Sequence, residues 1–276
     1  PASHSRPQAG YTLTEVIVAL VLGSTVAVAV VGGYIFASGS WQEQRQRLET
    51  QQNLRAAIDL LSRELRLAGA CLPTAGPTNI RPLTGADNGT TDTITVRANV
   101  RCAIGSLTSP AGAGATALFL DTVAEFVAGM QIYVLHADTT TGEYVQVDTV
   151  DQAANRLTLQ TPLTQGYPRD SSVYGAEAQA FAIGSAGTVP VLTVATALGG
   201  PQPAIEGIER LDIRYVLNRN CSPGPCDVVD LPTSESEWSL VRVIQLDIGA
   251  RSPRPITGGF YRLSQSIEVK PRNFLF

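Results

Sequence analysis

A long uncharged apolar run, from Val16 to Ala37, limits what the N-terminal part of this chain can be. As an α-helix that rises about 1.5 Å per residue, the run is roughly 33 Å long. That length matches the ~30 Å hydrocarbon core of a bilayer, and a helix satisfies its backbone polar groups internally. The run is too long for a secretory signal peptide, so we expect it to remain in the mature protein as a single-pass anchor.

A carboxylate stands at the very start of the run. The sequence there is Gly10-Tyr11-Thr12-Leu13-Thr14-Glu15. An acid near the bilayer core costs a few kcal/mol, so Glu15 is a functional candidate; the alternative is an interfacial position just outside the hydrocarbon. The stretch resembles the class III signal of type IV prepilins, with Tyr11 in place of the usual Phe and Thr14 in place of Ile or Leu.

The resemblance implies a processing site. In that family a membrane peptidase cuts after the Gly and methylates the new N-terminus, so residues 1–10 are a leader, Gly10 precedes the cut and Tyr11 becomes the first mature residue. Cleavage leaves an ammonium at Tyr11 that a neighbouring subunit's Glu15 can neutralise. Breaking such a buried pair costs several kcal/mol, so the pairing favours one register between neighbouring helices.

The helix is expected to continue past the membrane to Gly69, over residues 11–69. Apolar residues recur at three- and four-residue spacing and form one stripe: Leu54, Ala57, Ile58, Leu61, Leu65 and Ala68. The stripe fits either a coiled-coil seam or packing on the chain's own sheet. We favour the sheet, because strands follow.

The remainder predicts β-structure. Short strands with turn signals in 93–183 suggest a small sandwich or partly closed barrel. Alternating residues in 211–217, 240–248 and 261–269 predict an antiparallel sheet that covers the stripe. The expected fold is α+β: a long N-terminal helix, half transmembrane and half amphipathic, packed on an antiparallel head, with an extra all-β region. We expect four segments along the chain. They are the leader (1–10), the N-terminal helix with its transmembrane anchor (11–69), a β-rich head region with an insertion (70–200) and the C-terminal antiparallel sheet of the head (201–276).

Four cysteines fit an exported head. An even count suggests disulfides, Cys221 with Cys226 across a Ser-Pro-Gly-Pro turn and Cys71 with Cys102. A zinc site is the alternative, but its usual signal is two closely spaced pairs, and only one is present.

The C-terminal part of the sequence indicates which branch of the pilin-like proteins the chain resembles. The segments 208–215, Trp238 and 267–273, together with 64–69, look like PilW-type minor pilins and the related pseudopilin J of type II secretion. This implies a minor pilin that helps to initiate pilus assembly with other minor and major pilins, at the pilus tip, and that supports twitching, adhesion or DNA uptake. It also implies a prepilin peptidase as partner, and an inner-membrane anchor with the head outside the cytoplasm, later in the pilus. The alternatives are the J-type pseudopilin and an anchored DNA- or surface-binding module.

Signals for catalysis or cofactors are poor, so we expect no enzyme, no cofactor and no metal. His136 is expected on the surface, and Gly112–Ala117 lacks the βαβ context of a dinucleotide site. Asp87, Asn88 and Asp92 offer oxygen ligands for calcium, but the oxygens are few and the spacing is not that of an EF-hand loop, so we favour a solvated turn.

DNA binding has a weak basis. The formal net charge of −4 gives no bulk attraction to nucleic acid. The candidate cations for a DNA-binding surface near the C-terminal sheet are Arg251, Arg254, Lys270 and Arg272. Sparse arginines usually form a solvated face, and salt-dependent binding would support the DNA alternative.

Overall fold

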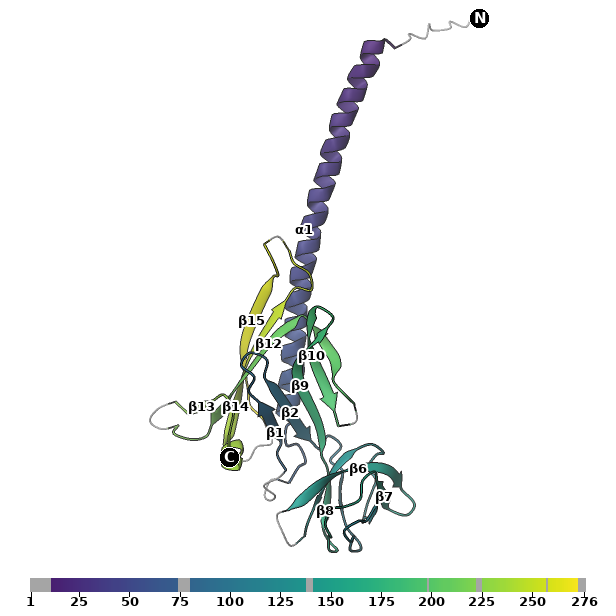
Figure 1. The fold of residues 1–276 in the computed structure, drawn as a ribbon, viewed down its shortest axis with the longest axis vertical. Helices are drawn as coiled ribbons and strands as arrows, with labels where there is room; N and C mark the ends of the chain where they lie inside the picture. Colours follow the sequence, from purple (N-terminus) through teal and green to yellow (C-terminus); the bar gives the residue numbers. More distant parts are fainter. Residues whose placement is uncertain are drawn as a thin grey trace, which may run out of the picture. The chain divides into compact units, whose positions relative to one another are not determined.

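A computed structural model describes residues 11–73, 80–137, 141–197, 199–221, 225–256 and 258–272. Helix α1 (Leu13–Leu67) is continuous, as no proline interrupts it (Figure 1). It ends where Gly69 takes the left-handed φ of 78°, which confirms the predicted stop. The chain divides into two compact units, Pro1–Leu48 and Glu49–Phe276, and the second unit is called the head below.

The amphipathic half of α1 lies in the core of the head. Its predicted stripe is confirmed: Leu54, Ala57, Leu61, Leu65 and Ala68 are buried and Ile58 is half-buried. The same core contains side chains from two sheets, called sheet A and sheet B. The stripe is therefore buried against the chain's own strands.

Sheet A has five antiparallel strands in the order β1-β2-β9-β10-β11. They are β1 (Leu83–Ala86), β2 (Thr93–Ala98), β9 (Glu177–Ala186), β10 (Val189–Thr196) and β11 (Gln202–Glu206). The sheet presents Ile94, Val96, Phe181 and Leu192 to the core around α1.

Sheet B is antiparallel in the order β13-β12-β14-β15, and a short helix α2 (Glu235–Ser239) precedes β14. Its strands are β12 (Ile208–Leu217), β13 (Val228–Val229), β14 (Val241–Arg251) and β15 (Arg262–Val269). The alternation predicted a buried face, and Leu211, Ile213 and Tyr215 are fully buried in the core around α1. A parallel bridge from Thr91 to Leu211 joins the two sheets.

The remaining strands form a third sheet in the order β3-β8-β5-β6-β7-β4 (Figure 1). They are β3 (Ile104–Ser106), β4 (Ala117–Phe119), β5 (Gln131–Leu135), β6 (Gly142–Asp151), β7 (Arg156–Leu159) and β8 (Ser172–Gly175). A bridge between Leu107 and Leu120 joins its two edges, so the sheet closes into a barrel. Its core is separate and includes Leu118, Ile132, Val147 and Val173.

The sequence predicted that all strands of 93–183 belong to one small sandwich or partly closed barrel. In the structure two of these strands lie outside the barrel. Thr93–Ala98 and Glu177–Ala186 pair with each other and belong to sheet A. The reason is non-local pairing. Strand β2 precedes the barrel in the sequence and β9 follows it, and the two strands pair with each other in the sheet that packs around α1. The barrel is therefore an insertion between two neighbouring strands of sheet A.

The root of the barrel is tied to the end of α1. The Gly69 N–H donates to the Arg97 carbonyl at 2.9 Å, and the Asn99 N–H donates to the Ala70 carbonyl at 2.8 Å. A small cluster of Leu72, Ile80, Tyr133 and Ala176 fills the junction. The barrel thus contacts the rest of the head through backbone bonds and packed side chains.

Candidate functional site

The first turn of α1 is closed by a reciprocal pair of hydrogen bonds. The Glu15 N–H donates to Thr12 Oγ1 at 3.3 Å, and the Thr12 N–H donates to the Glu15 carboxylate at 3.4 Å. This is a capping box, in which a Thr and a Glu three residues later satisfy free N–H groups at a helix start. Sequence reasoning missed it, although Thr-x-x-Glu before an apolar run is its signal.

The apolar run is uncovered within the described part of the chain. Val16, Leu20, Val26 and Val30 are each exposed, and α1 is the one described helix long and apolar enough to cross a membrane by length and composition. Exposed apolar surface of this extent is stable only in lipid or against other apolar surfaces. With the preceding motif, it supports a single-pass membrane anchor.

Two hydroxyls within the run, those of Ser24 and Thr25, bond to the helix itself. Ser24 Oγ donates to the Val21 carbonyl at 2.9 Å, and Thr25 Oγ1 donates to the Leu22 carbonyl at 2.8 Å. Hydroxyls bonded to their own helix need no water, so they are compatible with lipid. The surface beside Gly23, Gly32 and Gly33 is open, which allows another helix to approach closely.

The N-terminal site residues are placed as follows. Gly10 lies outside the described residues. Tyr11 is 85% exposed and directly precedes the cap, and Glu15 is exposed in the first turn. Within the described residues Glu15 bonds to Thr12 and not to Tyr11. The carboxylate is thus held at the helix start, on a surface that another subunit can reach.

The cysteines form both expected disulfides, Cys71–Cys102 and Cys221–Cys226. The first joins the turn after α1 to the start of the barrel. The second closes the connection between β12 and β13, where Arg219 bonds to Asp227 at 2.6 Å and to Glu237 at 3.1 Å. The Arg219 hydrogen bond lowers the pKa of Asp227, and hydrogen bonds from Thr233 lower the pKa of Glu237.

The predicted solvated turn is wrong for one of its residues. Asp92 is 3% exposed and accepts bonds from the N–H groups of Asn88 at 2.7 Å and Ile213 at 2.8 Å. Burial raises its pKa. Its neighbour Asp87 is exposed and bonds to the Gly89 N–H. Asp92 joins sheet A to sheet B, so its role here is structural.

His136 also differs from the surface position expected for it. It is half-buried beside the ring of Tyr167, at 5.9 Å between centroids. Tyr167 donates to Glu143 at 3.1 Å, and burial raises its pKa to about 12. In the described ranges no three His, Cys, Asp or Glu side chains are grouped to hold a metal ion.

The four cations considered for DNA do not form one patch, because Arg251 pairs with the start of β15 whereas Lys270 and Arg272 follow its end. Arg251 is engaged by the chain itself: it donates to the Thr188 carbonyl at 2.7 Å and lies over the ring of Phe260. The barrel segment 99–176 is acidic, with seven Asp and Glu against three Arg, a formal net charge of −4. Neither feature attracts a phosphate backbone.

Comparison with known proteins finds one family model. Residues 5–31 match the prokaryotic N-terminal methylation motif. No curated protein matches the chain significantly. The match spans Gly10, Tyr11, Glu15 and the first part of the apolar run, so the N-terminus carries the methylation motif of pilin-type proteins.

Proposed function

We propose that this chain is a PilW-type minor pilin that takes part in initiating and assembling a type IV pilus. The observation that carries the proposal is the methylation motif, followed directly by a capped helix start and an apolar run that is exposed along its length. Such a helix needs lipid before assembly and other helices afterwards. Its mechanism is assembly by helix packing and head contacts, not catalysis.

The proposed path begins in the inner membrane. A prepilin peptidase cuts after Gly10 and methylates the amino group of Tyr11. The ammonium then pairs with the Glu15 of a neighbouring pilin, which sets the register of the two helices. Two disulfides in the head fit a location outside the cytoplasm, where thiols are oxidised.

The J-type pseudopilin of a type II secretion system is the second candidate. The methylation motif favours it equally, because both assemblies use helices of this kind. The two functions differ in partners: a pilus role requires association with pilins of the filament, and a secretion role requires association with pseudopilins.

Mass spectrometry of the protein from its native membrane tests the proposal. For the wild type we expect loss of residues 1–10 and a methylated Tyr11. The Gly10→Val variant should retain the leader and stay unmethylated. Glu15→Gln serves as control, since it leaves the residue before the cut intact. An uncut wild-type chain, or cleavage after the apolar run, would overturn the pilin proposal.

A further inference from the structure

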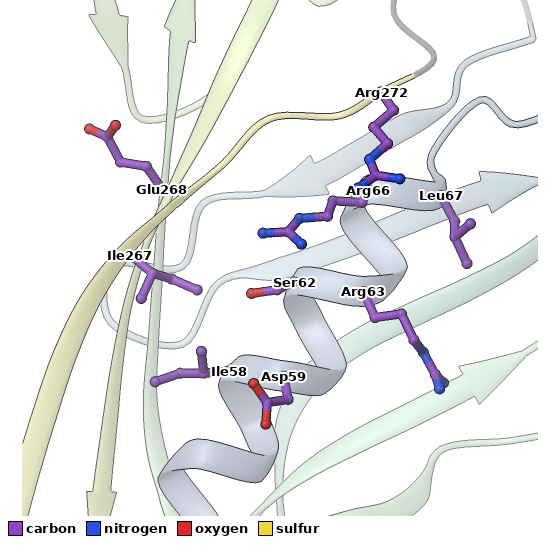
Figure 2. A pocket seen from close by; sticks show the side chains of 9 residues that line it. All are labelled: Ile58, Asp59, Ser62, Arg63, Arg66, Leu67, Ile267, Glu268 and Arg272. Atoms are coloured by element: carbon purple, nitrogen blue, oxygen red, sulfur yellow. The ribbon is translucent and has the colours of Figure 1, made fainter.

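A groove of about 550 Å³ lies in the head between the exposed flank of α1 and strand β15 (Figure 2). Ile58 on the helix and Ile267 on the strand lie on its opposite walls, and Ser62 lies one turn after Ile58 on the helix. Figure 2 shows that Ile267 points toward the helix, whereas Glu268 points to the other side of the strand. The two isoleucines thus form an apolar stretch of the groove, beside the carboxylate of Asp59.

Strand β15 is an open edge. It pairs with β14 from Ile244–Val269 to Arg251–Arg262, and it is the last strand of sheet B among the described residues. An edge strand presents N–H and C=O groups that can pair with another strand. Residues 262–269 contain no proline or lysine, which commonly protect such edges.

An added strand would fit the groove. Neighbouring strands lie about 4.8 Å apart, so the next strand after β15 would run along the uncovered flank of α1. Alternate side chains of that strand would face Ile58 and Ile267. Sheet B would then extend over a part of the helix that is open in the isolated chain.

Two guanidinium groups lie at one end of the groove. Arg66 is in the last turn of α1, and the Arg272 N–H donates to the Arg66 carbonyl at 3.4 Å. Neither side chain has an ion pair or hydrogen bond with any described residue. Arg63, by contrast, pairs with Glu64 at 2.9 Å, and Asp59 lies two helical turns before Arg66. The Arg66–Arg272 end is therefore cationic.

The dipole of α1 explains only one of the two arginines at this end of the groove. A cation in the last turn stabilises the helix dipole by about 0.3–1 kcal/mol, which accounts for Arg66. It does not account for a second arginine brought to the same groove, where like charges repel. A carboxylate relieves that repulsion, and arginine binds carboxylates through paired, directional hydrogen bonds.

We propose that an extended segment of a second polypeptide adds to β15 as a fifth strand of sheet B, with a carboxylate bound by Arg66 and Arg272. This rests on the proposed function, in which the second polypeptide is a neighbouring pilin-type subunit. The groove would recognise two features of that subunit. One is an apolar side chain facing Ile58, and the other is an Asp, Glu or C-terminal carboxylate bound at the cationic end.

Photocross-linking in the native membrane tests the proposal on the full chain. A benzophenone amino acid replaces Ser62, and mass spectrometry identifies the cross-linked peptides. We expect an extended, carboxylate-bearing segment of a second chain with its own methylation motif. The Arg66→Gln/Arg272→Gln variant should lower the yield at least tenfold. The control Arg55→Gln/Arg242→Gln removes the same charge from exposed positions outside the groove, and its yield should stay within twofold.

Three results would overturn the proposal: cross-links confined to this chain, cross-links to a helical segment, or a yield unchanged by removing both groove arginines. The identified peptide separates a side-chain carboxylate from a C-terminal one. N-terminal processing and a second cross-linker at Val26, measured on the same membranes, report pilin assembly independently. Normal processing and helix cross-links without groove cross-links would refute only the added strand. Groove cross-links on an unprocessed chain would refute only the pilus role.

Discussion

Ala98 and Glu177 are register partners across strands β2 and β9, although the whole barrel lies between them in the sequence. The chain therefore leaves sheet A and returns to it at one place. The barrel has its own apolar core, whereas the helix and sheets A and B share another. This arrangement is that of a module inserted into sheet A.

We predict that the barrel can be removed without unfolding the rest of the head. Residues 99–176 are replaced by Asn-Gly, a dipeptide that favours the tight turn of a hairpin. Cys71→Ser accompanies the deletion because Cys102 is lost. Hydrogen exchange should still show protected amides in β2, β9 and β12, since their pairing and the core around α1 do not include the barrel.

The junction supplies the control for this deletion. Leu72 and Ile80 lose the covering Tyr133, so some destabilisation at this cluster is expected in any case. Replacing both with Ser in the shortened chain should reduce aggregation and keep the exchange pattern. Loss of protection throughout sheet B would contradict the prediction, because it would make the barrel one folding unit with the rest of the head.

The sequence predicts local periodicity well. The stripe Leu54–Ala68 and the alternation in 211–217 each follow from residues close in the chain, and both are confirmed by burial. The insertion could not be predicted this way, because the pairing of Ala98 with Glu177 is non-local. For the same reason the sequence indicated one covering sheet where the structure has two.

The candidate site residues also divide into those that the sequence alone indicates and those that only the fold brings together. The N-terminal motif is contiguous, so Gly10, Tyr11 and Glu15 stand out without coordinates. The groove unites Ile58 and Arg66 with Ile267 and Arg272, which are distant in sequence and meet only through the fold. Asp92 was misassigned to a solvated turn because its partner, the Ile213 N–H, comes from another sheet.

The Cys71–Cys102 disulfide should stabilise the chain more than Cys221–Cys226. The bonds close loops with sequence separations of 31 and 5 residues. The chain-entropy relation gives about 3.7 and about 2 kcal/mol for such loops. Denaturant unfolding of Cys71→Ser/Cys102→Ser and Cys221→Ser/Cys226→Ser, both as full chains in the same detergent, measures the difference. Equal losses would show that constraint of the unfolded chain does not dominate.

Asp92→Asn should destabilise the head although it removes a buried charge. The carboxylate accepts from two backbone N–H groups, and an amide turns one acceptor into a donor that faces an N–H. An unsatisfied buried donor costs about 1–3 kcal/mol, which we expect as the loss of unfolding free energy at pH 7. The exposed Asp87→Asn is the matched control and should change stability by less than about 0.5 kcal/mol.

The Arg219 ion pairs should make the β12–β13 connection sensitive to acid. The pKa values of Asp227 and Glu237 are lowered from the ordinary 3.8 and 4.5, so the folded state favours both carboxylates. This stabilisation is present above those ordinary values and is lost as pH falls through the lowered ones. The Asp227 amide, which donates to the Arg219 carbonyl, should keep its exchange protection at the ordinary carboxyl pKa values and lose it only at lower pH. Arg219→Gln should lose it already at pH 7, whereas an identical profile in both proteins would count against the ion pairs.

Glu15 has two roles that substitutions can separate. In the isolated chain it caps α1 through Thr12, and in the proposed filament it pairs with the ammonium of a neighbour's Tyr11. Glutamine keeps the hydrogen bond of a capping box but carries no charge, whereas alanine removes both. If charge pairing sets the register, Glu15→Gln and Glu15→Ala should both reduce cross-linking from Val26 to neighbouring pilins at least tenfold. Cleavage after Gly10 should be normal in both. Normal cross-linking in Glu15→Gln together with a loss in Glu15→Ala would assign Glu15 to the cap alone, because only the hydrogen bond distinguishes the two variants.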